Sequence, residues 1–393
     1  MHIRRNQRRR LSIGINILTQ TEYLQTKTHK LSVPLKIHLT ALAFNGMLYL
    51  VVVLRCLRGA WPVEFHAWAP LFYTMNQREW LHMAKIFFTY EQQLNKLQLE
   101  KDLIIPNTTV AKLTLEKLSY YSLIGGYKQL FKHTPSQKYI YGVTFDELVA
   151  FYYFDEELRS LFMKYILHVE RHIKSLLSYH FCEKYGESDT EYLDINNYTL
   201  TKKNHTQINR LVHSMQKAIA LPSQYTYISH HANTYSNVPL WVAMNAFTFG
   251  QVSKMFQYIT NDVQYKISQK FEHITERELH QFITVLARCR NVCAHGERLF
   301  SFRIHETIPN TLLHKKLQIS QKNGSYIYGK QDLFSVVIAL RYLISAEDFK
   351  AFKSGLVKLI NKVLKQCPHL THEQLLKEMG FPENWKKIMR YKK

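Results

Sequence analysis

The sequence predicts an all-α fold. From residue 90 onward, apolar residues recur at the three- and four-residue spacing of amphipathic helices. Glycine and proline, which interrupt helices, are sparse at 13 and 10 of 393 residues. The sequence shows no convincing set of alternating strands, no glycine-rich phosphate loop and no internal repeat. A helical bundle with an additional helical region before it is therefore the expected architecture.

The first 82 residues differ in composition from the remainder. They hold eleven of the 52 Lys and Arg residues but only three of the 30 Asp and Glu residues, and they include an apolar run at 39–54. That run is shorter than the roughly 20 residues of a membrane-spanning helix. We consider three origins for 1–82: sequence upstream of a true start at Met75 or Met83, a disordered basic leader, and a membrane anchor. The first is favoured, so we expect no membrane partner.

The region 83–143 is expected to be helical. A helical pattern begins at Tyr90, and a second occupies 108–131, where Thr108 and Thr109 are candidate caps and Gly125-Gly126 forms a break. The tyrosines of this region and the next could stack on nucleic-acid bases, but such aromatic stripes are more often part of a core. These tyrosines are Tyr120, Tyr121, Tyr152 and Tyr153.

The region 144–310 is expected to form the helical core. One or two long helices should cover 144–186, because Thr144 and Glu147 have capping-box spacing and Gly186 supplies a stop. Three further helical patterns follow within this core, the last one beginning at Thr275 with Glu278 three residues on. They occupy 201–219, 240–259 and 275–295. The region 311–393 adds helical patterns at 331–344 and 348–364, which are expected to pack on the core.

The charge of the chain favours a polyanionic partner. The formal net charge is +22, and residues 83–393 keep 41 basic and 27 acidic residues, or +14. A surplus of this size points to nucleic acid first and to an anionic membrane second. The five cysteines, an odd number without a framework spacing, indicate free thiols in a reducing compartment, and hence a cytoplasmic location. Cys289 and Cys293 lack enough neighbouring ligands for a metal, so neither a metal nor a cofactor is expected.

A polar cluster ends the helix predicted over 276–295. On a helical wheel, Leu279, Phe282, Ile283 and Leu286 form a buried stripe, which Arg290, Asn291 and His295 continue. Polar groups on such a stripe are costly unless they are paired or used. Two structural explanations remain open here: a polar network with a neighbouring helix, for which Glu170 is a candidate, or cations that interact with the helix dipole.

A functional explanation is also available. Arg, His and Asn suit cleavage of RNA, because the substrate's own 2′-hydroxyl is the nucleophile. The protein then needs an imidazole for proton transfer and a guanidinium for the charge of the phosphorane, and it requires no metal. A single histidine cannot readily serve as both base and acid in one turnover, so a second copy of the chain would complete the site.

At these residues the sequence resembles a known family. RNVCAH, 290–295, resembles the R-(N)-x(3)-H signature of HEPN ribonucleases, and RNVCAHGERLF resembles its form in abortive-infection (Abi-type, AbiD/AbiF-like) HEPN proteins. Further segments resemble that family in the same order, so that the resemblance covers about 86–360 and leaves 1–82 outside. They are FTYEQQLNKLQLEKDLII, YYSLIGGYKQLF, FYYFDEELRSLFMKYILHVERHIKSLLSYHFCEKYG, PLWVAMNAFTFGQVSKMF and LFSVVIALRYLI.

The resemblance implies a HEPN-type helical bundle and roles for particular residues. Arg290 and His295 would be catalytic, with Asn291 as the polar residue beside the arginine. Glu297 and Arg298 would shape the loop that follows. Glu170 and Arg171, on the helix expected to pack against the motif, would support the site or contact RNA. Some members carry a modifiable tyrosine two residues after the histidine; Glu297 stands there in this chain, so that form of control is not expected.

The resemblance also implies antiphage defence, and a small noncoding RNA beside some members. The leading hypothesis is therefore a metal-independent endoribonuclease that acts as an abortive-infection toxin, as a homodimer and under control of a bound noncoding RNA. The alternative is a catalytically quiet protein that holds a noncoding RNA on its basic face. The intact Arg290–His295 pair favours the enzyme.

Overall fold

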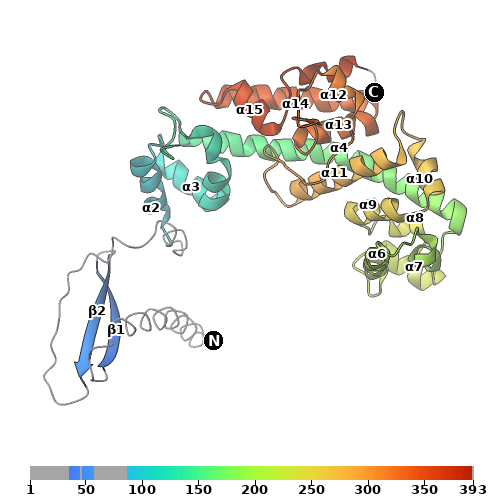
Figure 1. Cartoon of the computed structure of the whole chain (residues 1–393), viewed down its shortest axis with the longest axis horizontal. Helices are drawn as coiled ribbons and strands as arrows, with labels where there is room; N and C mark the ends of the chain where they lie inside the picture. Colours follow the sequence, from blue (N-terminus) through green and yellow to red (C-terminus); the bar gives the residue numbers. More distant parts are fainter. Residues whose placement is uncertain (1–34, 45–46, 57–85, 134, 392–393) are drawn as a thin grey trace. The chain divides into compact units, whose positions relative to one another are not determined.

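The computed structural model describes the backbone of residues 35–44 and 47–56 and all of residues 86–133 and 135–391. The chain divides into two units, Met1–Ile86 and Phe87–Lys393. In the first unit, β1 (Leu35–Phe44) and β2 (Met47–Cys56) pair as an antiparallel hairpin (Figure 1). The described residues of the apolar run 39–54 are thus extended, and the alternative of a spanning helix does not fit them. The basic residues at the start of the chain lie outside the described residues.

The second unit is built around one long helix, α4 (Phe145–Tyr185), which has 41 residues (Figure 1). Its start is the predicted capping box: Thr144 accepts from the backbone of Glu147, whose carboxylate accepts from the backbone of Thr144. The helix ends at Gly186, whose φ of 96° suits glycine. The all-α prediction is confirmed for this unit, in which the only described strands are the two-residue β3 (Gln321–Lys322) and β4 (Ser325–Tyr326).

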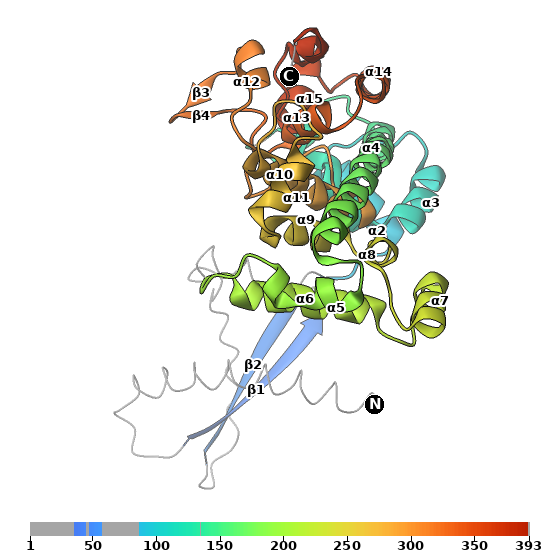
Figure 2. The ribbon, with the colours of Figure 1, turned by 90° about the vertical axis from the view of Figure 1, so that its right-hand side faces the viewer.

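Several helices of the second unit pack directly on α4, and the others pack on these or on one another (Figures 1 and 2). Before α4 the chain forms α2 (Tyr90–Asn95), η3 (Lys96–Glu100), α3 (Thr108–Leu118), η4 (Tyr121–Gly125) and η5 (Lys128–Phe131). After α4 come α5 (Asp189–Leu193), η6 (Ile195–Asn197), α6 (His205–Ile219), α7 (Thr226–Tyr235), α8 (Leu240–Ala243), α9 (Phe249–Tyr258), α10 (Asn261–Ser268) and α11 (Glu276–Ala294). The chain closes with α12 (Leu312–Lys316), α13 (Leu333–Leu343), α14 (Ala346–Gln366), α15 (His372–Met379) and η7 (Trp385–Arg390). Those in direct contact with α4 are η4, α8, α9, α10, α11, α13 and α14.

Two of the predicted helical segments are interrupted. The segment 108–131 breaks first at Ser119, which has a φ of 59°, and its N-cap is Asn107 rather than a threonine. The segment predicted over 240–259 stops at Ala243 and restarts at α9, because Thr248 and Gln251 form a capping box there. A strong cap inside an apolar pattern starts a new helix even where the periodicity continues.

The core is a continuous set of buried apolar side chains along α4. On the α14 side, the rings of Phe162 and Phe352 meet edge to face at 5.0 Å between centroids. Gly355 of α14 lies so close to α4 that a Cβ there would be 3.0 Å from Leu161. On another side α4 contacts α11, the helix that carries the polar cluster (Figure 2). Among the described residues, no helix has both the length and the apolar character needed to cross a membrane.

Candidate active site at the end of α11

The helix α11 is fixed along its length by its cap and its buried face. Thr275 and Glu278 form the predicted capping box, with the Thr275 backbone donating to the Glu278 carboxylate at 2.9 Å. Leu279, Ile283 and Leu286 are fully buried, as the wheel predicts. This face packs against α4, α9 and α13, so the position of the last turn is set by the core.

The end of α11 is closed by the turn that contains the motif. The backbone N–H of Gly296 donates to Cys293 at 3.3 Å, and that of Glu297 donates to Val292 at 3.0 Å. This pair of bonds is a Schellman motif, which needs a left-handed residue, and Gly296 supplies it with a φ of 68°. His295 is the C-cap residue, and its backbone N–H donates to Asn291 at 2.9 Å. The turn therefore fixes the backbone of the histidine.

Arg290 lies against the buried carboxylate of Glu170 on α4. Its Nε is 3.6 Å from Glu170 Oε2, and its side chain is 31% exposed. The other carboxylate oxygen, Oε1, pairs at 2.9 Å with Lys174, which also donates to the Phe247 carbonyl at 2.7 Å. Glu170 thus bridges two cations. The polar network that one structural explanation requires exists for Arg290.

Asn291 and His295 lie on the surface. The wheel places them on the continuation of the buried stripe, but both residues are exposed, because the core ends before the last turn of α11. Within the described residues, neither side chain makes a hydrogen bond or an ion pair. An exposed imidazole at a fixed backbone position can exchange a proton with a bound molecule. A guanidinium held by one carboxylate still has donors to offer an anion.

The two residues after the motif contact different elements. Arg298 is exposed, and its Nη1 donates to the carbonyl of Gly126 at 3.1 Å. The side chain of Glu297 is exposed, while its carbonyl accepts from Arg159 Nη1 at 3.2 Å. Both contacts attach the loop after α11 to elements earlier in the chain.

Arg171 does not join the cluster around Glu170. It is exposed, and its Nε donates to the Leu167 carbonyl of its own helix at 3.4 Å. Successive residues of a helix point about 100° apart, so Glu170 faces α11 while Arg171 faces away from it.

A buried carboxylate that the sequence reasoning missed holds the loop after the motif. Asp155 of α4 is fully buried and accepts from the backbone of Leu299 at 3.1 Å and of Phe300 at 2.7 Å. Its Oδ2 also accepts from Arg159 at 2.7 Å and from the Tyr127 hydroxyl at 2.8 Å. Burial raises the pKa of Asp155, while Arg159 and these hydrogen bonds act in the opposite direction. We call these three side chains, Tyr127, Asp155 and Arg159, the loop clamp.

The sequence does carry a signal for the loop clamp. Asp155 and Arg159 are four residues apart, and the apolar residues Phe154, Leu158 and Phe162 share this stretch of the helix with them. Opposite charges on an apolar face of a helix indicate a buried, paired group. The partner loop lies 144 residues further along the chain, and no local pattern identifies it.

Of the four described cysteines, Cys289 and Cys367 are buried in the core, and Cys182 and Cys293 are partly buried. Cys182, Cys289, Cys293 and Cys367 are free, and burial raises the pKa of Cys289. In the part of the chain that the structure describes, no group of three or more His, Cys, Asp or Glu side chains could hold a metal ion.

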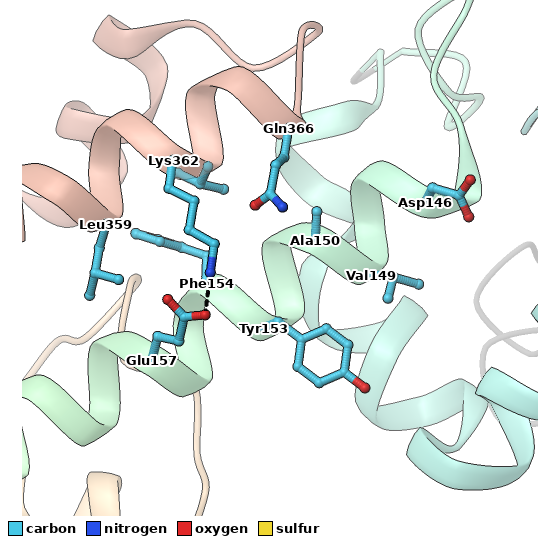
Figure 3. A pocket seen from close by; sticks show the side chains of 10 residues that line it. Asp146, Val149, Ala150, Tyr153, Phe154, Glu157, Leu359, Lys362 and Gln366 are labelled. Atoms are coloured by element: carbon cyan, nitrogen blue, oxygen red, sulfur yellow. Dashed lines mark hydrogen bonds and ion pairs between the residues drawn. The ribbon is translucent and has the colours of Figure 1, made fainter.

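A pocket of about 390 Å³ lies elsewhere on α4, beside α14 (Figure 3). Lys362 of α14 reaches Glu157 of α4 there in an ion pair, with Tyr153 nearby. None of the residues that line it belongs to the predicted site. The candidate site is instead an open surface at the end of α11, and a long substrate with exposed charge would suit it better than a small enclosed one.

Comparison with known proteins finds a family match over the part of the chain that contains the candidate site, but it does not test a reaction. Residues 113–301 match the family model of the Abi-like proteins, which spans from α3 to the loop after α11. The match contains the motif, Glu170 and the loop clamp. No curated protein matches, and no solved structure matches.

Proposed function

We propose, from the premise that this chain belongs to the Abi-like family through residues 113–301, that it is a metal-independent endoribonuclease of abortive infection. The family supports a role in defence against phage. The observation that carries the activity is the last turn of α11, where exposed His295 and Asn291 follow an Arg290 that Glu170 holds. These residue types suit cleavage of RNA by its own 2′-hydroxyl.

The proposed reaction uses groups of the substrate and of this chain alone. The 2′-hydroxyl of the RNA attacks the adjacent phosphorus, the P–O5′ bond breaks, and a 2′,3′-cyclic phosphate and a 5′-hydroxyl result. His295 would transfer protons, and Arg290 would stabilise the charge of the phosphorane. Asn291, one turn before the histidine, would orient one of these groups. Glu170 would hold Arg290 in place, since the carboxylate contacts its Nε.

The site is proposed to be completed by a second copy of the chain. One histidine serves poorly as both base and acid in one turnover. Two copies of the chain would supply two histidines, one for each role. His295 and Asn291 are exposed at the end of α11, where another chain can reach them. A homodimer with the two 290–298 segments facing each other would supply the second set. A noncoding RNA bound to the basic surface is the proposed means of control.

The decisive experiment measures cleavage of RNA by purified variants. Arg290→Ala and His295→Ala should each lower the rate by about 100-fold or more, since positioned acid–base and electrostatic groups contribute factors of this size. The matched controls are Arg210→Ala and His213→Ala on α6, which remove the same side chains from an exposed surface. EDTA should leave the wild-type rate unchanged, and the products should carry 2′,3′-cyclic phosphate or its hydrolysed form.

The alternative function makes a different prediction. A catalytically quiet RNA-binding protein would copurify with RNA, and its rate of RNA decay would be the same for the wild type and for His295→Ala. Its support is the net charge of +14 on residues 83–393. Equal rates in the two proteins would reject the enzyme.

A further inference from the structure

The segment between α3 and α4 lies next to the loop that follows the candidate site. The Arg298 guanidinium donates to the Gly126 carbonyl at 3.1 Å, and a Cβ at Gly126 would be only 3.4 Å from the Arg298 Cδ. Gly126 directly follows η4 and is two residues before η5. A polymer bound at the motif and extending past Arg298 would therefore come close to η4 and η5.

This segment presents an exposed aromatic ring. Tyr121 of η4 is 80% exposed, whereas Tyr127 six residues later is buried in the loop clamp. The Tyr121 ring lies alongside Gly125, 3.5 Å from the place where a Cβ would be, so no side chain at that position covers it. A large ring exposed in this way does not contribute to the core, and it offers a flat face to a planar ligand.

Three lysines accompany this ring: Lys128 and Lys132 lie on the same segment, and Lys101 lies on the turn before α3. The backbone of Tyr139 donates to the Lys101 carbonyl at 2.9 Å and pairs with Lys132 in an isolated bridge, so Lys101 and Lys132 flank one residue. The Lys132 ammonium lies 5.1 Å from the centroid of the Tyr139 ring. Burial lowers the pKa of Lys132 to about 8, and the nearby ammonium groups of Lys128 and Lys101 add to this effect.

These lysines are not neutralised by carboxylates of the described residues. The two acidic side chains beside Lys101 have other partners: Glu100 pairs with Lys96, and Asp102 pairs with Lys138. Like charges held together without a counter-charge are costly, and a bound phosphate removes that cost. The cluster thus has the electrostatic character of an anion-binding surface.

We propose that Tyr121, Lys101, Lys128 and Lys132, together called the tyrosine–lysine surface, hold single-stranded RNA that runs to the candidate site past Arg298. The proposal rests on the proposed function for the identity of the strand. A stacking ring combined with cationic groups is the arrangement that binds single strands, since the ring takes a base and the lysines follow the phosphates. Bases inside a duplex are already stacked and cannot reach Tyr121. The surface would therefore favour unpaired RNA over duplex RNA.

The test measures equilibrium binding in a background that does not cleave. His295→Ala protein is titrated into a fluorescently labelled, unstructured 20-nucleotide RNA at several salt concentrations. Adding Tyr121→Ala should weaken binding about tenfold with little change in the salt dependence, as expected for loss of one stacked base. Adding Lys128→Ala and Lys132→Ala together should weaken binding and reduce the slope of log K against log salt by about 1.4, or about 0.7 for each lost phosphate contact.

The matched control removes the same charge from another helix. Lys358→Ala with Lys365→Ala, two exposed lysines of α14, should leave the affinity within about twofold of the background. If this control weakens binding as much as the Lys128 and Lys132 pair does, the charge acts non-specifically and the proposal is wrong. Duplex RNA that binds as tightly as the single strand, with no effect of Tyr121→Ala, would also overturn it.

Failure of the surface and failure of the enzyme are distinguishable. If wild-type protein does not cleave RNA but the binding results hold, the surface stands and the proposed activity falls. If the wild-type protein cleaves RNA, and the Tyr121 and lysine variants bind and cleave RNA as well as the wild type does, the proposed activity is supported and the proposed surface is wrong.

Discussion

Single buried charges decide how the candidate site is held. Glu170 contacts Arg290 from the motif side of α4, and Asp155 holds the backbone of the loop that follows the motif. Both are carboxylates inside an apolar environment, where a charge is tolerated only with partners in place. Glu170 has two cations, and Asp155 has a guanidinium, a hydroxyl and two backbone N–H groups. Removing either carboxylate leaves the cations that pair with it without a counter-charge.

Asp155→Ala should therefore be strongly destabilising. The change leaves the Arg159 guanidinium without its counter-charge and two backbone N–H groups without their acceptor. We expect a loss of about 3–5 kcal/mol in the free energy of unfolding. The measurement is chemical denaturation followed by circular dichroism. Glu156→Ala is the matched control, because Glu156 is the next residue of the same helix and is exposed; its change should stay within about 0.5 kcal/mol. A similar, small effect of both variants would contradict the role of the loop clamp.

At the scale of elements, the sequence predicts best the features that depend on a few neighbouring residues. The capping boxes at Thr144 and Thr275 are confirmed, because each depends on residues three apart. The buried stripe of α11 is confirmed up to Leu286 for the same local reason. The exposure of Asn291 and His295 is not predictable from periodicity, since it depends on where the neighbouring helices stop covering α11.

Other differences also have non-local causes. Within the loop clamp, Asp155 holds backbone groups 144 and 145 positions further along the chain, and Arg298 meets a carbonyl 172 positions away. The hairpin of β1 and β2 was not expected, although Val51–Val53 has the β-branched residues that favour strands. An apolar run does not show which of its residues pair with one another; only the register of the two strands in the structure shows this.

The short helix α12 contains a histidine whose protonation should control stability. His314 is fully buried; its Nδ1 accepts from the Thr311 backbone at 3.1 Å, and its Nε2 donates to the Gly329 carbonyl at 2.9 Å. Burial lowers its pKa to about 4. The unfolded chain, with an ordinary pKa of about 6.5, therefore binds the proton first as the pH falls. The contribution of His314 is present above pH 6.5 and is lost as the pH falls from 6.5 to 4.

His314→Gln tests this contribution. Glutamine can accept and donate at similar positions but does not titrate in this range. Between pH 7 and pH 5, the wild type should lose about 2 kcal/mol more of its free energy of unfolding than the variant does. Denaturation at both pH values measures the difference. His280 titrates in the same direction in both proteins, so the comparison isolates His314. His213→Gln, at an exposed position, should behave as the wild type does; a variant at 314 that tracked the wild type would refute the assignment.

At the scale of the second unit, the proposed function and the proposed tyrosine–lysine surface together call for an open site that a large polyanion can reach. The motif lies on an open surface rather than in the pocket beside α14, and the segment that Arg298 contacts carries the exposed ring of Tyr121 and the partly buried Lys128 and Lys132. Such a surface would hold an RNA strand without enclosing it. To hold the scissile phosphate in a defined position, the substrate must also be contacted from its other side. One copy of the open site does not provide that contact.

A homodimer would supply that contact, and mixed dimers provide the test. If two 290–298 segments form one composite site, a dimer with one His295→Ala subunit should have little activity. Wild-type protein equilibrated with a threefold excess of His295→Ala protein would find a wild-type partner about one time in four, so activity per wild-type chain should fall to about a quarter. A threefold excess of an unrelated protein without ribonuclease activity controls for dilution and crowding. Undiminished activity after proven subunit exchange, or light scattering that shows a fully active monomer, would reject the composite site and leave each chain with a site of its own.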